Sequence, residues 1–285
     1  MKTIILSDIS NSKETIIPYG LRLAVALESE ADVLHVIDPR THQGTYSSVS
    51  DSQSISPGET LTQAETIKLE KHRVSNEMDK LLSSEGSRLN YPLKINRLIV
   101  ENSLEEELEH RFALNPDCLV VVNAEADEDM FENTSEIVRL IKKAGVPVIV
   151  VPPGEKFTDI GNALMPLNID RNNYISMKKL RFLFDHFRMT VNAVGVASQN
   201  DYTELELKAI AWRDVAKEYV LPHSTVKTNI LEGKDFITTV NNYFHRNNHD
   251  LLIMVNDNND SKKAVTDTIM FLKTIHSPAL VYFPN

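Results

Sequence analysis

Four acidic residues follow an apolar run at a position where α/β proteins often bind phosphate. The run "DCLVVV" ends at Val122, and the chain then carries Glu125, Asp127, Glu128 and Asp129. Carboxylates in a loop can hold a hard cation such as Ca²⁺. An EF-hand loop also needs a central glycine, which "EADEDMFENTSE" lacks. The sequence therefore favours a solvated acidic loop and predicts no metal site.

Other reactive residue types have simpler explanations. His245 and His249 have the spacing of metal ligands on a helix, but "HRNNHD" is typical of a helix C-terminus, where cations favour the helix dipole. Asp8 and Ser10 could suggest a nucleophile, yet no histidine is placed beside them by sequence order, and Ser10 fits a helix N-cap. Cys118 fits a buried apolar position. The serines in 47–56 could be phosphorylated, although a flexible loop is the better explanation. No catalytic residue is predicted, so we expect a protein that is not an enzyme.

Composition excludes several classes of protein. The chain has 285 residues, a net charge of −10 and a single cysteine. Residues 1–153 carry 25 acidic and 15 basic side chains, whereas the remainder is balanced. This pattern opposes binding to nucleic acid or to an anionic membrane. The lone cysteine and the absence of a signal-peptide pattern predict a cytoplasmic protein.

Strand and helix patterns alternate along the chain, interrupted by the polar stretch 40–60. Strands are predicted at 3–9, 32–38, 93–102, 117–122, 147–152, 162–169, 189–196, 225–233, 250–255 and 278–284. Helices are predicted at 14–30, 61–84, 103–114, 131–143, 172–187, 201–219, 235–247 and 262–275. Ser103 and Glu106 form a capping-box pattern at one helix start.

The second half repeats the order of the first. Asp117 and Asp250 each begin a fourth strand, and Asn123 and Asn256 each end it. A repeat of this length indicates a domain duplication. We therefore predict an α/β fold of two tandem, doubly wound, five-stranded parallel-sheet domains, 1–152 and 160–285. The segment "PPGEKFTDIG" between them is typical of a linker.

Several segments resemble universal stress proteins. "IILSDIS" is similar to the start of that family, "LHVID" to its second strand, and "GVPVIVVP" to its closing strand. "NALMPLNID" resembles a second copy of the start. The resemblance implies the adenine-nucleotide alpha-hydrolase-like fold, with strand order 3-2-1-4-5 in each half. It also implies that the two halves pair within one chain through their fifth strands; a homo-oligomer and an unknown protein partner are left open.

Nucleotide-binding members of the family carry Gly-x2-Gly-x9-Gly-(Ser/Thr) after the fourth strand. Asn123 and Ala126 stand at the first two glycine positions, and the final pair falls near Thr134. In the second half, Asn256 and Asn259 replace the glycines, with Lys262 and Lys263 just beyond. Close approach of a phosphate to the backbone needs glycine, so both phosphate loops are predicted to be degenerate.

The family's other nucleotide contact is an aspartate that ends the first strand. Asp8, with Ser10 nearby, retains it in the first half, whereas Asn168 replaces it in the second. Neither half therefore has a complete ATP site, and no cofactor is expected. The resemblance implies a non-catalytic stress-response binding or regulatory protein. The alternatives are an ATP- or AMP-binding universal stress protein with non-standard loops, and an interaction scaffold that uses the acidic first half and the 40–60 stretch.

Overall fold

The structure, a computed structural model, describes residues 1–7, 9, 15–40, 62–89, 91–124, 133–167, 174–198, 201–256 and 261–284. The first half contains β1 (Lys2–Leu6), α1 (Ile17–Ala26), β2 (Glu30–Ile37), α2 (Gln63–Gly86), β3 (Ile95–Glu101), α3 (Leu104–Leu114), β4 (Cys118–Asn123), α4 (Thr134–Ala144) and β5 (Val148–Val151). The second half contains β6 (Asn162–Pro166), α5 (Tyr174–Lys178), α6 (Arg181–Phe184), β7 (Thr190–Ala197), α7 (Tyr202–Tyr219), β8 (Thr225–Glu232), α8 (Phe236–Arg246), β9 (Leu251–Val255), α9 (Ser261–Thr274) and β10 (Ala279–Tyr282).

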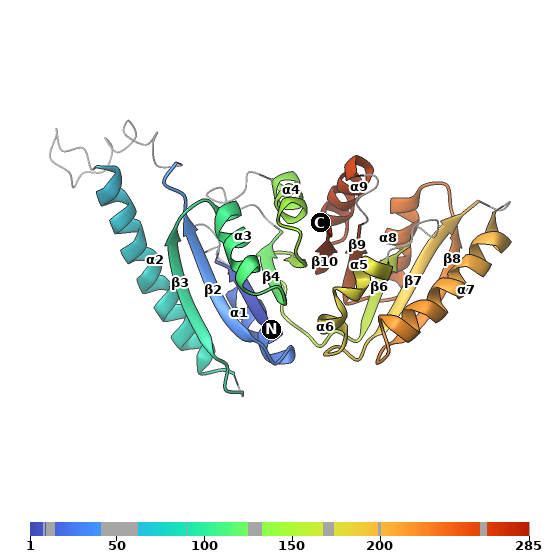
Figure 1. The fold of residues 1–285 in the computed structure, drawn as a ribbon, viewed down its shortest axis with the longest axis horizontal. Helices are drawn as coiled ribbons and strands as arrows, with labels where there is room; N and C mark the ends of the chain where they lie inside the picture. Colours follow the sequence, from blue (N-terminus) through green and yellow to red (C-terminus); the bar gives the residue numbers. More distant parts are fainter. Residues whose placement is uncertain are drawn as a thin grey trace.

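The strands form one continuous ten-stranded sheet in the order β3-β2-β1-β4-β5-β10-β9-β6-β7-β8. Each half therefore has the predicted order 3-2-1-4-5. The two halves meet where β5 pairs antiparallel with β10, with Val148 opposite Val281 and Val150 opposite Ala279. Figure 1 shows the halves on either side of this junction, with α4 and α9 flanking it.

The helices cover both faces of the sheet, because alternate side chains of each strand point to opposite faces. Ile5, Val33 and Val121 belong to the core under α1, α2, α6 and α7. Ile4 and Leu34, each one residue away, belong to the core under α3, α4, α8 and α9. This three-layer arrangement confirms the predicted α/β class.

Two predicted helices differ from the structure. The helix predicted at 14–30 is α1, Ile17–Ala26, with proline in its first turn; the chain then passes through Glu28 at φ 49 and enters β2 at Glu30. The helix predicted at 172–187 is split into α5 and α6. Between them the Leu180 N–H donates to the Met177 carbonyl at 2.9 Å, a three-residue bond that tightens and interrupts the α-helical winding.

Candidate functional site

The carboxyl ends of the parallel strands form the edge where ligands of open α/β sheets bind. Asn123 is the last residue of β4 and is buried, and Thr134 is the first residue of α4 and is half-buried. Asn256 directly follows β9, and Lys262 and Lys263 lie exposed in the first turn of α9. Asp8, Ser10, Ala126, Asn168, Asn259 and the four acids of the loop lie outside the described residues.

The backbone donors at these strand ends are already bonded within the sheet. The Ala124 N–H donates to the Val151 carbonyl at 2.7 Å, and the Asn256 N–H donates to the Tyr282 carbonyl at 2.9 Å. A phosphate loop uses such N–H groups to hold oxygen atoms of the ligand. At these two positions, a phosphate would have to compete with the sheet.

The side chain of Asn256 is also committed. Its Nδ2 donates to Thr268 Oγ1 of α9 at 3.2 Å, and that hydroxyl donates to the Ala264 carbonyl at 2.8 Å. Where the family pattern has a glycine without a side chain, this amide links the end of β9 to α9.

In the first half, the Asn133 carboxamide oxygen caps α4 by accepting the Ser135 N–H at 2.9 Å. This donor at the helix start is therefore satisfied within the protein.

A buried polar row crosses the centre of the first half, and sequence reasoning did not find it. Leu6 is opposite Leu34 and Ile5 is opposite Val121, so following each strand onward places Ser7 beside both His35 and Asn123. All three are buried, and Ser7 Oγ has no hydrogen-bond partner among the described residues. His35 is thus adjacent to Ser7 on the neighbouring strand. Asp8 and Ser10, for which sequence order offers no histidine neighbour, lie outside the described residues.

The signal for this row was available in the sequence. Ser7 and His35 each interrupt an otherwise apolar run. Ser7 follows Leu6 and His35 follows Leu34, and Leu6 pairs with Leu34 across β1 and β2. Pairing the strands in parallel would have brought them together. Since all three side chains are buried, they are not exposed to a substrate in solvent.

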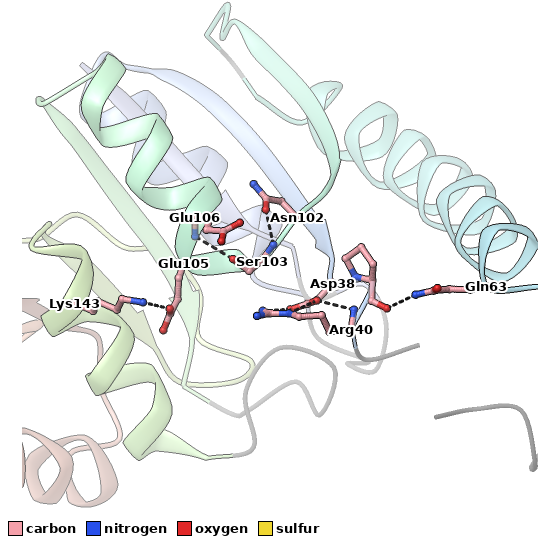
Figure 2. A network of polar contacts seen from close by, with 9 residues as sticks. Asp38, Arg40, Gln63, Asn102, Ser103, Glu105, Glu106 and Lys143 are labelled. Carbon is pink, nitrogen blue, oxygen red and sulfur yellow. Dashed lines mark hydrogen bonds and ion pairs between the residues drawn. The ribbon is translucent and has the colours of Figure 1, made fainter. Parts of the chain in front are cut away.

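A second polar network lies at the ends of β2 and β3 (Figure 2). The Arg40 guanidinium donates to both carboxylate oxygens of Asp38, and Gln63 Nε2 donates to the Pro39 carbonyl at 2.6 Å. The hydrogen bond and charge of Asp38, with further acidic charge from Glu106, raise the pKa of Arg40. This network ties the start of α2 to the end of β2.

The predicted capping box at α3 is only half formed. Ser103 Oγ accepts the Glu106 N–H at 3.3 Å, as predicted. In a full capping box the Glu106 carboxylate would accept the Ser103 N–H. Here the side chain of the preceding residue, Asn102, accepts it instead, through Oδ1 at 2.8 Å. Glu105 of the same first turn pairs with Lys143 of α4 and so joins the two helices.

The corresponding place in the second half is an open groove of about 890 Å³. Ser198 follows β7, and Glu232, Lys234 and Phe236 line the groove from the end of β8 and the start of α8. Among the described residues, the first half has a charged network at this edge and the second half has an open groove that Glu232 and Lys234 help to line.

Metal binding finds no support in the described ranges. No group of three histidine, cysteine or carboxylate side chains lies close enough there to hold an ion. His245 is exposed in the last turn of α8, whereas His249 is buried after the helix, so the pair does not converge. The buried Cys118 thiol has its pKa raised to about 12, mainly by desolvation, which makes it unreactive.

No helix in the described part of the chain is long and apolar enough to span a bilayer.

No family model and no curated protein matches this chain. Solved structures do match over nearly its full length. A universal stress protein from Archaeoglobus fulgidus is 11% identical with a TM-score of 0.63, and the match covers 100% of this chain and 98% of that one. A putative universal stress protein from Pseudomonas aeruginosa is 13% identical with a TM-score of 0.61, covering 99% and 93%. A protein of unknown function from the same species has 13% identity and a TM-score of 0.58, covering 99% and 92%. The chain thus has the tandem fold of the solved universal stress proteins.

Proposed function

We propose that this protein is a non-catalytic, cytoplasmic binding or regulatory protein of the stress response, and that its nucleotide sites are degenerate. The fold shared with universal stress proteins supports the general role. The observation that carries the degenerate part of the proposal is at Asn256. Its backbone N–H and its side-chain amide are both engaged by Tyr282 and Thr268, at the position where a nucleotide site needs a bare glycine.

Electrostatics supports the proposal in the first half. Glu125, Asp127, Glu128 and Asp129 follow β4 in the sequence, where a triphosphate would have to lie. One acid at ~4 Å from a phosphate charge is unfavourable by about 1 kcal/mol in water and about 4 kcal/mol at an effective dielectric of 20. Several acids would remove the roughly −8 kcal/mol that micromolar binding needs.

The loop of the second half carries two acids, Asp257 and Asp260, instead of four, and they are followed by Lys262 and Lys263. Both amines are exposed in the first turn of α9, where a helix N-terminus also favours anions. Any residual binding of an anion should therefore occur here, and weakly, because the second half has Asn168 where the family has its aspartate.

Native mass spectrometry of the purified full chain tests the proposal. We expect the mass of the polypeptide with no co-purified nucleotide, even when cells are lysed in the presence of Mg²⁺. A stoichiometric adduct of the mass of ATP or AMP would overturn the proposal in favour of a nucleotide-binding universal stress protein with non-standard loops.

A further inference from the structure

The turn that joins α8 to β9 encloses a histidine in an apolar setting. His249 is 6% exposed, and its ring lies 5.7 Å from that of Tyr243 and 5.4 Å from that of Phe244. Nδ1 lies 3.2 Å from the Phe244 carbonyl, which fixes the ring and places a proton on that nitrogen. Nε2 is buried and has no hydrogen-bond partner among the described residues. A neutral imidazole is tolerated here, whereas an imidazolium would bury an unsatisfied N–H and a charge.

The same turn holds the beginning of the second half. Asp250 Oδ2 accepts the backbone N–H groups of Gly161 and Asn162 at 3.0 and 2.8 Å. The Asp250 N–H donates to the Asn162 carbonyl at 2.8 Å, and Asn162 Nδ2 donates to the Asn247 and Asn248 carbonyls. Asn248 is in the left-handed region at φ 49, a conformation that asparagine adopts more readily than most residues. These bonds attach the end of the segment 152–161, which connects the two halves, to the α8–β9 turn.

We propose that His249 is a pH-sensitive latch: protonation of its ring opens the 247–250 turn and releases the start of β6 from Asp250. The imidazolium can leave its apolar site, or it can draw the Asp250 carboxylate toward itself. Both movements break the bonds to Gly161 and Asn162. The predicted consequence is a looser connection between the halves in acid, which gives a stress-linked protein a direct response to acidification. This inference does not depend on whether nucleotide binds.

The groups around the ring set the direction of the response. Asp250, directly before β9, is the charged group among the described residues whose charge raises the pKa of His249. Desolvation is the larger effect, so the pKa of His249 is lowered overall. The Tyr243 phenol of α8 has its pKa raised by burial and stays neutral. A lowered folded-state pKa means that the opened turn binds the proton more tightly. The latch is therefore fully closed above the ordinary histidine pKa near 6.5 and weakens as the pH falls toward the lower, folded value.

The first half provides an internal comparison. The turn between α3 and β4 carries Pro116 where the second half has His249, and Asp117 where it has Asp250. That turn has no titratable ring. Acidification should consequently affect the start of β6 and not the matching start of β1.

Amide hydrogen exchange of the full chain between pH 7.5 and 5.0 tests the latch. Once corrected for intrinsic exchange, the protection of the Gly161 and Asn162 amides should fall by up to about tenfold per pH unit below ~6.5. The Val120 amide of β4, which donates to the Pro147 carbonyl, should stay constant. His249→Phe and His249→Gln should abolish the dependence, and His245→Gln, which removes an exposed histidine from the adjoining helix α8, should preserve it.

Protection at Gly161 and Asn162 that does not change with pH in the unaltered chain would overturn the proposal. So would an unchanged dependence in both His249 variants. If neither variant folds, the unaltered chain still decides: the NMR titration of the His249 ring must have the same midpoint as the shifts of the Gly161 and Asn162 amides, and different midpoints would contradict the latch.

Discussion

Leu280 of β10 lies directly opposite Ile149 of β5 in the antiparallel junction at the centre of the sheet. Both side chains are buried, at 2% and 1% exposure. Ile149 comes from the first half and Leu280 from the second, yet they belong to the same core. Each half thereby covers an apolar edge strand of the other, an edge that would otherwise invite pairing with another chain.

Separating the halves should therefore produce self-association. We expect residues 1–152 and residues 160–285, expressed alone, each to form dimers, because β5 or β10 would then pair with its own copy. Analytical ultracentrifugation measures the outcome. Monomeric, well-folded halves at micromolar concentration would contradict this role of the junction.

A buried carboxylate lies near the amino-terminal end of β2 in the first half. Asp32 is 2% exposed; it accepts from Asn96 Nδ2 at 2.7 Å and pairs with Lys2 at 3.3 Å and Arg111 at 3.5 Å. Asp32→Asn should lower the free energy of unfolding by about 2–4 kcal/mol, because it leaves two partly buried cations without this counter-charge. Urea denaturation provides the measurement.

The second half suggests a rescue for this variant. The equivalent positions hold Asn192 and Asn162, whose amides bond to each other at 2.7 Å. Adding Lys2→Asn to Asp32→Asn copies this pair and should recover part of the lost stability. Glu30 lies in the same strand as Asp32 and forms an exposed ion pair with Lys94. Glu30→Gln removes that pair, serves as the control and should have a much smaller effect. Equal losses for Asp32→Asn and Glu30→Gln would show that Asp32 has no special role.

Helix α1 approaches β1 closely at Gly20. A Cβ atom there would lie 2.6 Å from Ile5 Cγ1 and 2.7 Å from Ile5 Cδ1. Gly20→Ala should cost about 1–3 kcal/mol of overpacking, enough to outweigh the ~1 kcal/mol gain in helix propensity. Thermal and urea unfolding measure the net change.

Two further variants make this prediction specific. Gly86→Ala, at the end of α2 with no atom within 4 Å of the added Cβ, should be neutral or stabilising. Ile5→Ala should cost less in the Gly20→Ala background than in the unaltered chain, since it removes the clashing atoms. Strict additivity of the two changes would refute the close contact.

Much of the fold could be predicted because its strands are continuous apolar runs. "CLVVVN" and "VIVV" are buried on both faces and follow helical patterns, which is sufficient to predict parallel sheets between helices. The resemblance to universal stress proteins supplied the strand order. The interruption between α5 and α6 could not be predicted, because Met177, Leu180 and Leu183 keep helical spacing across the tightened turn.

The candidate site was predicted less completely. Asn123, Asn256 and Lys262 could be placed because they follow strands that were predicted correctly. The neighbours of Ser7 follow only when the predicted strands are paired in register, because His35 and Asn123 lie on the two strands next to β1. The role of Thr268 depends on the position of α9 against β9, which local patterns do not specify.

The central claim is that the first half no longer accepts a triphosphate, and a thermal-shift titration with Mg²⁺ and ATP tests it most directly. A ligand at a hundred times its Kd adds about 2.7 kcal/mol of stability, which corresponds to roughly 5–10 °C in Tm for a chain of this size. We predict a shift far below this at millimolar ATP, and we predict that Lys262→Gln with Lys263→Gln removes whatever shift is seen. A shift of the full size that survives this double substitution and is lost in Asp8→Ala would contradict the claim and show that the first half binds ATP.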